Sequence, residues 1–195
     1  MLILASASPR RAELLAAAGF SFETLVVDID ERPHPGESSD AYVRRLAAEK
    51  SAAAADIIRA PGAIVLGADT AVVIDGQILG KPRDDDDAAA MLRRLSGRAH
   101  DVVTGVSLRA GPVEVGCVEV TTVEFSVLDE ADVAWYVASG EGRDKAGAYA
   151  IQGLAARFIP RIHGSYSNVV GLPVASVHAL LGRIASSPGS GYSGR

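Results

Sequence analysis

The stretch Ala63-Ile-Val-Leu-Gly-Ala-Asp-Thr-Ala-Val-Val-Ile-Asp-Gly-Gln-Ile-Leu79 decides the fold class of this chain. Its first part, Ala63–Ala68, is a continuous apolar run of strand length, and we expect this buried strand to end at Asp69. Further on, Asp75-Gly76 separates the short apolar segments Ala71–Ile74 and Gln77–Leu79, which is typical of a two-residue hairpin turn. The stretch therefore predicts a buried strand followed by an antiparallel hairpin.

The residues before this stretch predict strands and helices in alternation. Leu2–Ala5 is a short apolar strand, and Ser8-Pro9 supplies an N-cap and a first helical residue. We expect that helix to run to Ala18, where Gly19 closes it. The remaining elements on this side are a strand at Phe22–Val27, a polar loop at Asp28–Ser39 and a helix capped by Asp40 that runs to about Ala55.

The residues after the stretch continue the alternation, which predicts a mixed-sheet α/β fold. The expected elements are helices at about Asp85–Leu95 and Val174–Ile184, a helix capped by Asp129 that runs through Ala138, β-rich stretches at Asp101–Leu108 and Val113–Val127, and a strand near Arg157–Ile162. We expect residues 1–185 to form one domain and the Ser/Gly-rich residues 186–195 to be a flexible tail. Within that tail, Gly189–Gly194 has the letter spacing of a dinucleotide fingerprint, but neither a strand nor a helix flanks it, so we do not expect a nucleotide site there.

Composition limits the class of protein. The 195 residues are 48% hydrophobic and 22% charged, which suits a globular chain of one large domain or two small lobes sharing a core. A net charge of −5 argues against nucleic-acid binding, and the single cysteine excludes an internal disulfide and fits a reducing cytoplasm. Because no basic stretch precedes the first apolar residues and no apolar run reaches roughly 20 residues, we expect a cytoplasmic protein without a membrane partner.

Two arginines lie in the first turn of the first predicted helix. The segment Ser6-Ala-Ser-Pro-Arg-Arg11 places Arg10 and Arg11 where the helix dipole disfavours positive charge. A polyphosphate bound at this helix N-terminus would compensate the two positive charges. The free N–H groups of the helix N-terminus also attract anions, which favours such a site. The alternative is two solvated surface arginines, and the residues alone leave both interpretations open.

Lys50 and Asp69 are the next candidates for chemistry. Lys50 falls on the apolar stripe of its predicted helix, where it either snorkels to solvent, which the residues alone favour, or reaches into a cleft. Asp69 follows a buried strand, where a carboxylate can polarise a water or bind a hard cation, or simply cap backbone N–H groups of a turn. These two interpretations of Asp69 also stay open.

Two charged segments follow the hairpin. Gly80-Lys-Pro-Arg83 is no Walker A motif, because Gly76 lies too close and a proline follows Lys81, although its two cations can either clamp phosphates or form a surface turn. The run Asp84–Asp87 is predicted to cap and complement a helix N-terminus rather than hold a metal. A zinc site is not expected, because the four histidines lack ligand spacing.

Taken together, these segments resemble the Maf family of nucleotide pyrophosphatases. The matching blocks occur in family order and cover nearly everything from Leu2 to Ile184. They are Ala5–Arg11, Leu66–Thr70, Gly80–Arg83, Leu95–Gly97, Asp144–Tyr149, Ile151–Leu154 and Gly164–Pro173. One such block alone would be weak, whereas the ordered set is specific.

The resemblance implies a two-lobed α/β fold around a mixed sheet, similar to that of inosine-triphosphate pyrophosphatase, with a central cleft. It also implies that this cleft hydrolyses nucleoside triphosphates between the α- and β-phosphates with a divalent cation, Mg²⁺ or Mn²⁺. By motif position, Asp69 matches the family's catalytic acid–base residue, and Glu31 with Asp69 matches the residues that support the metal. The phosphate-handling set is matched by Ser6, Arg10, Arg11, Lys50 and Lys81. The resemblance also implies a homodimer.

The resemblance extends to the base. Gln152-Gly153 looks like the type that favours dTTP and UTP, whereas the type that favours 7-methyl-GTP tends to have a glutamate there. A glutamine amide both donates and accepts, which suits the O4 and N3–H of uracil or thymine. Thr70 and Arg10 occupy the other positions linked to specificity. The alternatives are pyrophosphatases for 7-methyl-GTP or noncanonical purine triphosphates, and a nucleotide-binding regulator of septum formation without turnover.

Overall fold

A seven-stranded mixed sheet organises the fold in this computed structural model, which describes residues 1–58 and 60–186. The strand order is β2-β1-β3-β5-β6-β7, and β4 pairs with β3. β1 runs parallel to β2 and β3, whereas the β3–β4 and β6–β7 pairs are antiparallel. The strands are β1 (Leu2–Ala5), β2 (Phe22–Thr24), β3 (Ile64–Ile74), β4 (Gln77–Leu79), β5 (Ala99–Ala110), β6 (Val113–Glu124) and β7 (Arg161–His163). The predicted mixed-sheet α/β fold is confirmed.

The chain forms two compact units. Unit 1 comprises residues 1–69, 104–119 and 171–195, and unit 2 comprises residues 70–103 and 120–170. The strands β3, β5 and β6 each contribute residues to both units. The boundary within β3 falls directly after Asp69, so this residue ends the first segment of unit 1.

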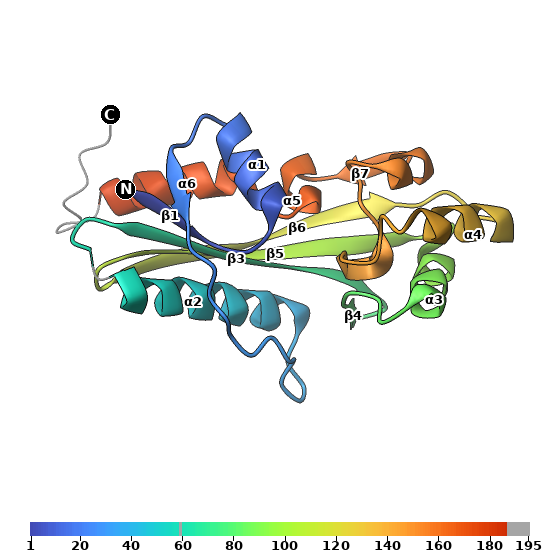
Figure 1. The fold of residues 1–195 in the computed structure, drawn as a ribbon, viewed down its shortest axis with the longest axis horizontal. Coiled ribbons are helices and arrows are strands. Elements are labelled where there is room, and N and C mark those ends of the chain that lie inside the picture. Colours follow the sequence, from blue (N-terminus) through green and yellow to red (C-terminus); the bar gives the residue numbers. More distant parts are fainter. Residues whose placement is uncertain (59, 187–195) are drawn as a thin grey trace. The chain divides into compact units, whose positions relative to one another are not determined.

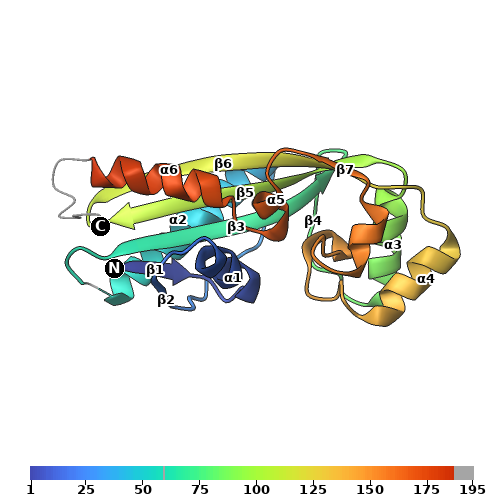
Figure 2. The ribbon, with the colours of Figure 1, turned by 90° about the horizontal axis from the view of Figure 1, so that it is seen from above.

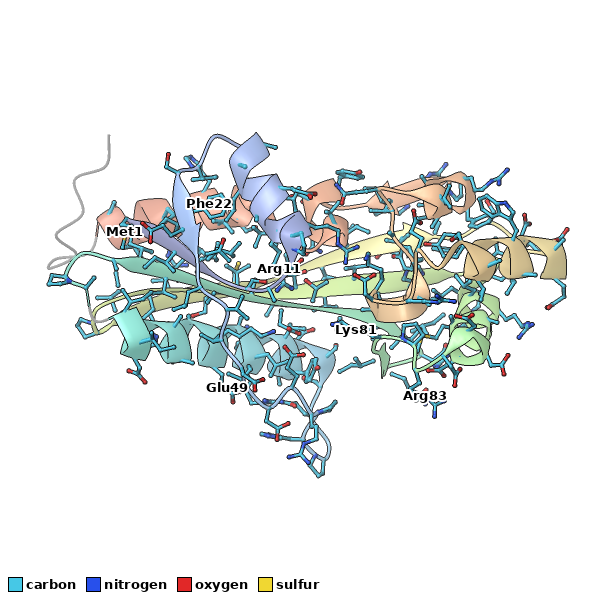
Figure 3. The ribbon with its side chains drawn as sticks, in the orientation of Figure 1. Met1, Arg11, Phe22, Glu49, Lys81 and Arg83 are labelled. Atoms are coloured by element: carbon cyan, nitrogen blue, oxygen red, sulfur yellow. The ribbon has the colours of Figure 1, made fainter. Side chains whose placement is uncertain are left out.

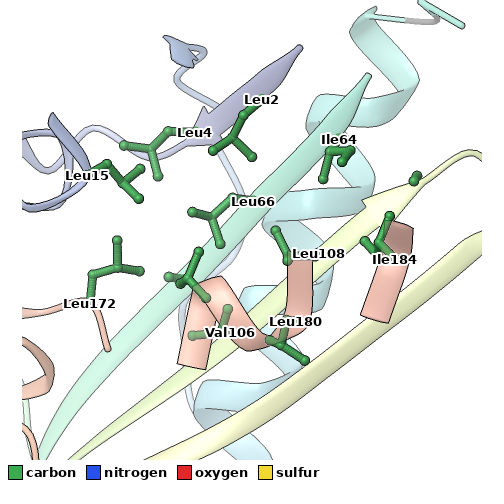
Figure 4. Packing of buried hydrophobic residues seen from close by; sticks show 13 residues of the cluster. Leu2, Leu4, Leu15, Ile64, Leu66, Val106, Leu108, Leu172, Leu180 and Ile184 are labelled. Carbon is green, nitrogen blue, oxygen red and sulfur yellow. The ribbon is translucent and has the colours of Figure 1, made fainter. Parts of the chain in front are cut away.

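Unit 1 is built in layers. Its helices are α1 (Pro9–Ala17), α2 (Ser39–Ile58) and α6 (Val174–Ala185). In Figure 1, α2 covers one face of the sheet, and α1 and α6 cover the other; Figure 2 shows β1 and β2 running beside the first half of β3. Figure 4 shows the core beneath α6, where Leu66 and Leu108 of the sheet pack against Leu180 and Ile184. These four side chains are at most 3% exposed, so their burial stabilises this layer.

Two glycines bring α2 very close to the sheet. A Cβ atom added at Gly67 of β3 would lie only 2.2 Å from the carbonyl oxygen of Ala47. One added at Gly105 of β5 would lie 2.2 Å from the carbonyl oxygen of Val43. Since real Cβ atoms do not approach so closely, the backbone of α2 sits directly on strands whose side chains are missing at these points.

Unit 2 arranges its helices around a second apolar cluster. Its elements are α3 (Asp85–Leu95), α4 (Glu130–Ser139), the 3₁₀ turns η1 (Ala146–Ala148) and η2 (Leu154–Phe158), and α5 (Tyr166–Val170). The predicted caps of α3 and α4 are confirmed, because the side chain of Asp84 accepts from the N–H of Asp87, and that of Asp129 from the N–H of Asp132. The buried cluster includes Leu92 of α3 and Tyr136 of α4.

Several predicted boundaries were wrong. β3 does not end at Asp69 but continues to Ile74, because β1 pairs with its first half and β4 with its second. The second helix begins at Ser39, where the Ser38 hydroxyl accepts from the N–H of Ala41, so Asp40 lies in the first turn and is not the cap. β2 ends at Thr24, and Arg157 belongs to η2, so β7 begins only at Arg161. The predicted tail, apart from Ser186, lies outside the described residues.

Candidate active site

Asp69 is held in the middle of a strand on the face that meets α2. Side chains two residues apart on a strand share a face, and Gly67 lies against the α2 backbone at Ala47 and Ser51. The carboxylate of Asp69 therefore points towards α2, and the residue is only 9% exposed. Because Asp69 lies inside β3, it is not a turn-capping residue, and its buried carboxylate requires another partner.

Lys50 of α2 is that partner. Its Nζ lies 2.6 Å from Oδ1 of Asp69 and 2.7 Å from Oε1 of Glu31, so one ammonium joins two carboxylates. Lys50 is 8% exposed, and the expectation that it snorkels to solvent was wrong. The physical reason is the glycine contact, which holds α2 so close to β3 that the lysine side chain reaches the strand instead of the surface.

Glu31 is delivered to Lys50 by a loop that α2 holds in place. The hydroxyl of Tyr42 donates to the backbone carbonyl of Glu31 at 3.0 Å, and Arg45 donates to the carbonyl of Arg32 at 3.1 Å. Arg45 also pairs with Glu37 at 2.7 Å, which fixes the far end of the loop. The sequence did not single out Tyr42 or Arg45, although Tyr42 lies two helical turns before Lys50 and so shares its face.

The pKa of the Tyr42 hydroxyl reflects its burial beside the negative charges of this site. Burial raises the pKa of the Tyr42 hydroxyl to about 12, and the negative charges of Asp69 and Glu31 act in the same direction. The hydroxyl therefore stays protonated at neutral pH and remains a donor to the loop. The Glu31 side chain is about half exposed, at 55%, which leaves this carboxylate accessible from solvent.

Arg11 is neither a solvated surface arginine nor a side chain without protein partners. Its Nε donates to the carbonyl of Gly171 at 2.8 Å, and its Nη1 donates to the carbonyl of Ala68 at 2.7 Å and to Oγ of Ser6 at 3.2 Å. Burial lowers the pKa of Arg11, while Asp69 and Glu31 raise it. Arg11 thus carries positive charge beside Asp69 and also ties β3 to the segment between α5 and α6. Figure 3 labels it beneath the first turn of α1.

The N-terminus of α1 lacks the usual local compensation for its dipole. Its first turn holds no acidic residue, and the N-cap Ser8 makes no side-chain capping bond. The Oγ of Ser6 instead accepts from the N–H of Ser8 at 3.1 Å, which turns the chain between β1 and α1. Arg10 is half-buried in that first turn, and its charge contributes to lowering the pKa of Arg11. Ser6, Arg10, Arg11, Glu31, Lys50 and Asp69 all belong to unit 1.

Three other predicted residues, Thr70, Lys81 and Gln152, belong to unit 2. Thr70 follows Asp69 in β3, and Lys81 lies exposed on the segment between β4 and α3, where Figure 3 labels it. That segment is joined to the turn η1, because the N–H of Gly147 donates to the carbonyl of Gly80 at 3.0 Å. Gly147 itself packs on β3, since an added Cβ would lie 2.9 Å from Val72.

Gln152 is exposed on a tight turn that Glu141 supports. One oxygen of Glu141 accepts from the hydroxyl of Tyr136 at 2.7 Å, and the other accepts from the N–H of Leu154 at 2.9 Å. Gly153 permits this approach, because an added Cβ would lie 1.9 Å from the Glu141 carboxylate. The glycine after Gln152 therefore has a packing role that a motif alone does not reveal.

Comparison with known proteins decides the family. Residues 1–184 match the family described as Maf-like protein. The chain belongs to this family. A relative from Myxococcus xanthus named dTTP/UTP pyrophosphatase is 54% identical over 183 residues, covering 94% of this chain and 92% of that protein. A relative of the same name from Escherichia coli O157:H7 is 51% identical, covering 92% of this chain and 91% of that protein.

A solved structure shares the Maf-like fold at low identity. The Ham1 protein of Staphylococcus aureus is 13% identical, with a TM-score of 0.53 and coverage of 93% of this chain and 98% of that one. At this identity the likeness concerns the fold alone, and it agrees with the fold that the sequence motifs implied.

Two groups of carboxylates that the sequence analysis singled out have different roles in this Maf-like chain. Within residues 1–58 and 60–186, no group of three or more His, Cys, Asp or Glu side chains is arranged to hold a metal ion. The run Asp84–Asp87 serves α3 as predicted: Asp85 pairs with Arg143 and Asp87 with Arg83. Asp69 and Glu31, which converge on one cation, are hard oxygen ligands of the kind that Mg²⁺ and Mn²⁺ accept. Among the described helices, none is long and apolar enough to cross a bilayer.

Proposed function

We propose that this chain hydrolyses dTTP and UTP to the nucleoside monophosphate and pyrophosphate. The observation that carries the proposal is the pair of carboxylates, Asp69 and Glu31, that share the ammonium of Lys50 beside the buried Arg11. The names of relatives at 51–54% identity over more than nine-tenths of the chain support the substrate class.

Asp69 is the residue we assign to the reacting water. Its carboxylate orients a water towards the α-phosphorus and accepts the proton as the new P–O bond forms, while the bond to the bridging oxygen breaks and pyrophosphate leaves. The rigid position of Asp69 in the middle of β3 suits this role, because a fixed base loses little entropy in reaching the reacting geometry. No covalent intermediate is required.

Positive side chains match the charge of the leaving group. A triphosphate carries about four negative charges at neutral pH, and pyrophosphate gathers negative charge as it departs. We assign Arg10, Arg11 and Lys50 of unit 1 and Lys81 of unit 2 to this charge, with Ser6 as an uncharged donor. The assignment of Lys81 rests on its motif position.

Glu31 and Asp69 are the residues that would hold a divalent cation, Mg²⁺ or Mn²⁺. Such a cation polarises phosphoryl oxygens and stabilises charge on the leaving group. The donor set fits this role, because both residues offer carboxylate oxygens and Glu31 is accessible from solvent.

Gln152, with Thr70 and Arg10, is assigned to base selection. The Gln152 amide would donate to O4 and accept from N3–H of the pyrimidine. The turn that carries Gln152 is held by Glu141, so the amide is presented from a fixed backbone. We further propose that residues 1–185 act as one domain. We also propose a cytoplasmic homodimer without nucleic-acid or membrane partners, for which light scattering tests the oligomeric state and cell fractionation tests the localisation.

The decisive experiment is a panel of triphosphates with phosphate and pyrophosphate detected separately. We expect dTTP and UTP to give monophosphate and pyrophosphate in equal amounts, with a divalent cation present. Preferred turnover of 7-methyl-GTP or inosine triphosphate would replace the substrate assignment. Stepwise release of phosphate through a diphosphate would refute cleavage at the α–β bond, and nucleotide binding without turnover would favour a regulatory protein.

A further inference from the structure

Lys50 occupies the position between the two carboxylates that are assigned to the cation. Its ammonium lies 2.6 Å from Asp69 and 2.7 Å from Glu31, on one oxygen of each. Carboxylate oxygens are also the ligands that a divalent cation such as Mg²⁺ accepts, so a cation held by these two residues would need oxygens that Lys50 now contacts. An ammonium has no lone pair, so it cannot join the coordination sphere and can only compete with it. Oδ1 of Asp69 and Oε1 of Glu31, the two oxygens that Lys50 contacts, therefore accept either Lys50 or the cation.

The charges around the pair oppose cation binding as long as Lys50 remains. Asp69 and Glu31 carry two negative charges, which Lys50 and the buried Arg11 already compensate, and Arg10 adds a further positive charge beside Arg11. A divalent cation alone would add two further positive charges to this partly buried site without a matching anion, which is costly away from water. A triphosphate brings the negative charge that restores the balance and gives the Lys50 ammonium a new anionic partner.

The protein also supplies few ligands for the cation. Among the described residues, no third histidine, cysteine or carboxylate joins Asp69 and Glu31. Magnesium prefers six oxygen ligands, so the remaining positions fall to water and to phosphate oxygens. Ligand number and charge balance thus favour cation binding together with the nucleotide over binding of the cation alone.

We propose that Lys50 is a built-in counter-ion that holds Asp69 and Glu31 together before substrate arrives and transfers to the triphosphate when the cation takes its place. This inference rests on the proposed function, because it concerns the same site. Its consequence is positive coupling: nucleotide frees the carboxylates by attracting Lys50, and the cation frees Lys50 for the nucleotide. Lys50 then has both roles, as partner of the carboxylates and as phosphate ligand, in different states.

The test is a titration of the nucleotide-free protein with Mn²⁺ alone, in which electron paramagnetic resonance measures the free ion. We expect Lys50→Met to bind Mn²⁺ at least about fivefold more tightly than the wild type, the lower end of typical coupling between sites. Lys50→Gln should behave in the same way and guards against a folding defect of the first variant. Added Mn²⁺ should also raise the Tm of Lys50→Met more than that of the wild type, because the ion replaces the lost ammonium.

Two controls locate the effect. Arg44→Met removes a positive charge from the exposed side of the same helix and should leave Mn²⁺ binding within about twofold of the wild type, because screening by solvent weakens exposed charges. Lys50→Met combined with Asp69→Asn should lose the gain, since one of the two ligands is gone. Unchanged or weaker Mn²⁺ binding by folded Lys50→Met and Lys50→Gln would overturn the proposal. The titration needs no turnover, so failure of the triphosphate panel is a separate result.

Discussion

Gly67→Ala is the substitution that should disturb the site without changing any of its polar groups. The added Cβ would lie 2.2 Å from the carbonyl oxygen of Ala47 and 2.7 Å from the amide nitrogen of Ser51, whereas ordinary contacts begin at 3.4 Å. Both atoms belong to helix backbone and cannot rotate away. The helix and β3 must therefore separate by about 1 Å at this point, which follows from the difference between those distances.

The displacement acts on the neighbouring ion pair. Lys50 immediately precedes Ser51, so its Nζ should move with the helix, and the 2.6 Å contact with Asp69 would stretch beyond hydrogen-bond length. Overpacking of this kind costs about 1–3 kcal/mol of unfolding free energy. Misplacement by about 1 Å can lower activity by roughly 10²-fold. Both effects should appear in Gly67→Ala.

The assay combines urea unfolding with steady-state hydrolysis of UTP. Gly182→Ala in α6 is the matched control, because beyond its own helix backbone no described atom lies within 4 Å of its added Cβ. In a helix interior that change should stabilise by up to about 1 kcal/mol and leave kcat/KM intact. Gly105→Ala should also destabilise the folded protein, because its added Cβ would lie 2.2 Å from the carbonyl oxygen of Val43 in α2. Wild-type stability and activity of Gly67→Ala would refute the close contact as the feature that positions Lys50.

Four further predictions concern single side chains. Asp69→Asn should lower turnover by roughly 10²-fold or more while nucleotide binding, followed by calorimetry, largely survives; near-normal turnover would exclude Asp69 as the base. Gln152→Glu should lower the ratio of kcat/KM for UTP to that for 7-methyl-GTP by about tenfold to a hundredfold, and an unchanged ratio would remove Gln152 from the base site. Arg11→Ala should lower the unfolding free energy by on the order of 3 kcal/mol, because it leaves the carbonyls of Gly171 and Ala68 without their charged donor. Arg10→Ala should not have this effect, and equal Tm values for the two variants would contradict the prediction. Burial lowers the pKa of His100 to about 4, so the unfolded chain binds a proton at this residue before the folded chain does as the pH falls. His100 should therefore lower the unfolding free energy by roughly 1–2 kcal/mol between about pH 7 and about pH 5. In His100→Gln the pH dependence of urea unfolding should be flatter by that amount, and an identical slope would show that His100 is not the cause.

The stability prediction for Arg11 reverses what its sequence position suggests. A cation in the first turn of a helix opposes the dipole, so its removal should raise the Tm or leave it unchanged. In the structure the guanidinium bonds to carbonyl oxygens of Gly171 and Ala68, which lie 160 and 57 positions away in the chain. Local electrostatics are thus outweighed by hydrogen bonds that only the folded chain forms.

The sequence by itself determined the features that depend on near neighbours. The caps at Asp84 and Asp129 and the hairpin turn at Asp75-Gly76 occur where the sequence predicts them, because each depends on hydrogen bonds or backbone angles within about four residues. The ordered motifs likewise indicated the Maf-like family that residues 1–184 match.

Only the tertiary structure decided how the candidate site is assembled. Lys50 and Asp69 are 19 positions apart, and no periodicity within α2 or β3 indicates that they meet. They meet because Gly67 and Gly105 let the α2 backbone rest on the sheet, and because Tyr42 and Arg45 hold the Glu31 loop against the same helix. Such contacts depend on the packing of elements that are distant in the chain, where the absence of a side chain at one glycine determines which charged groups can reach each other.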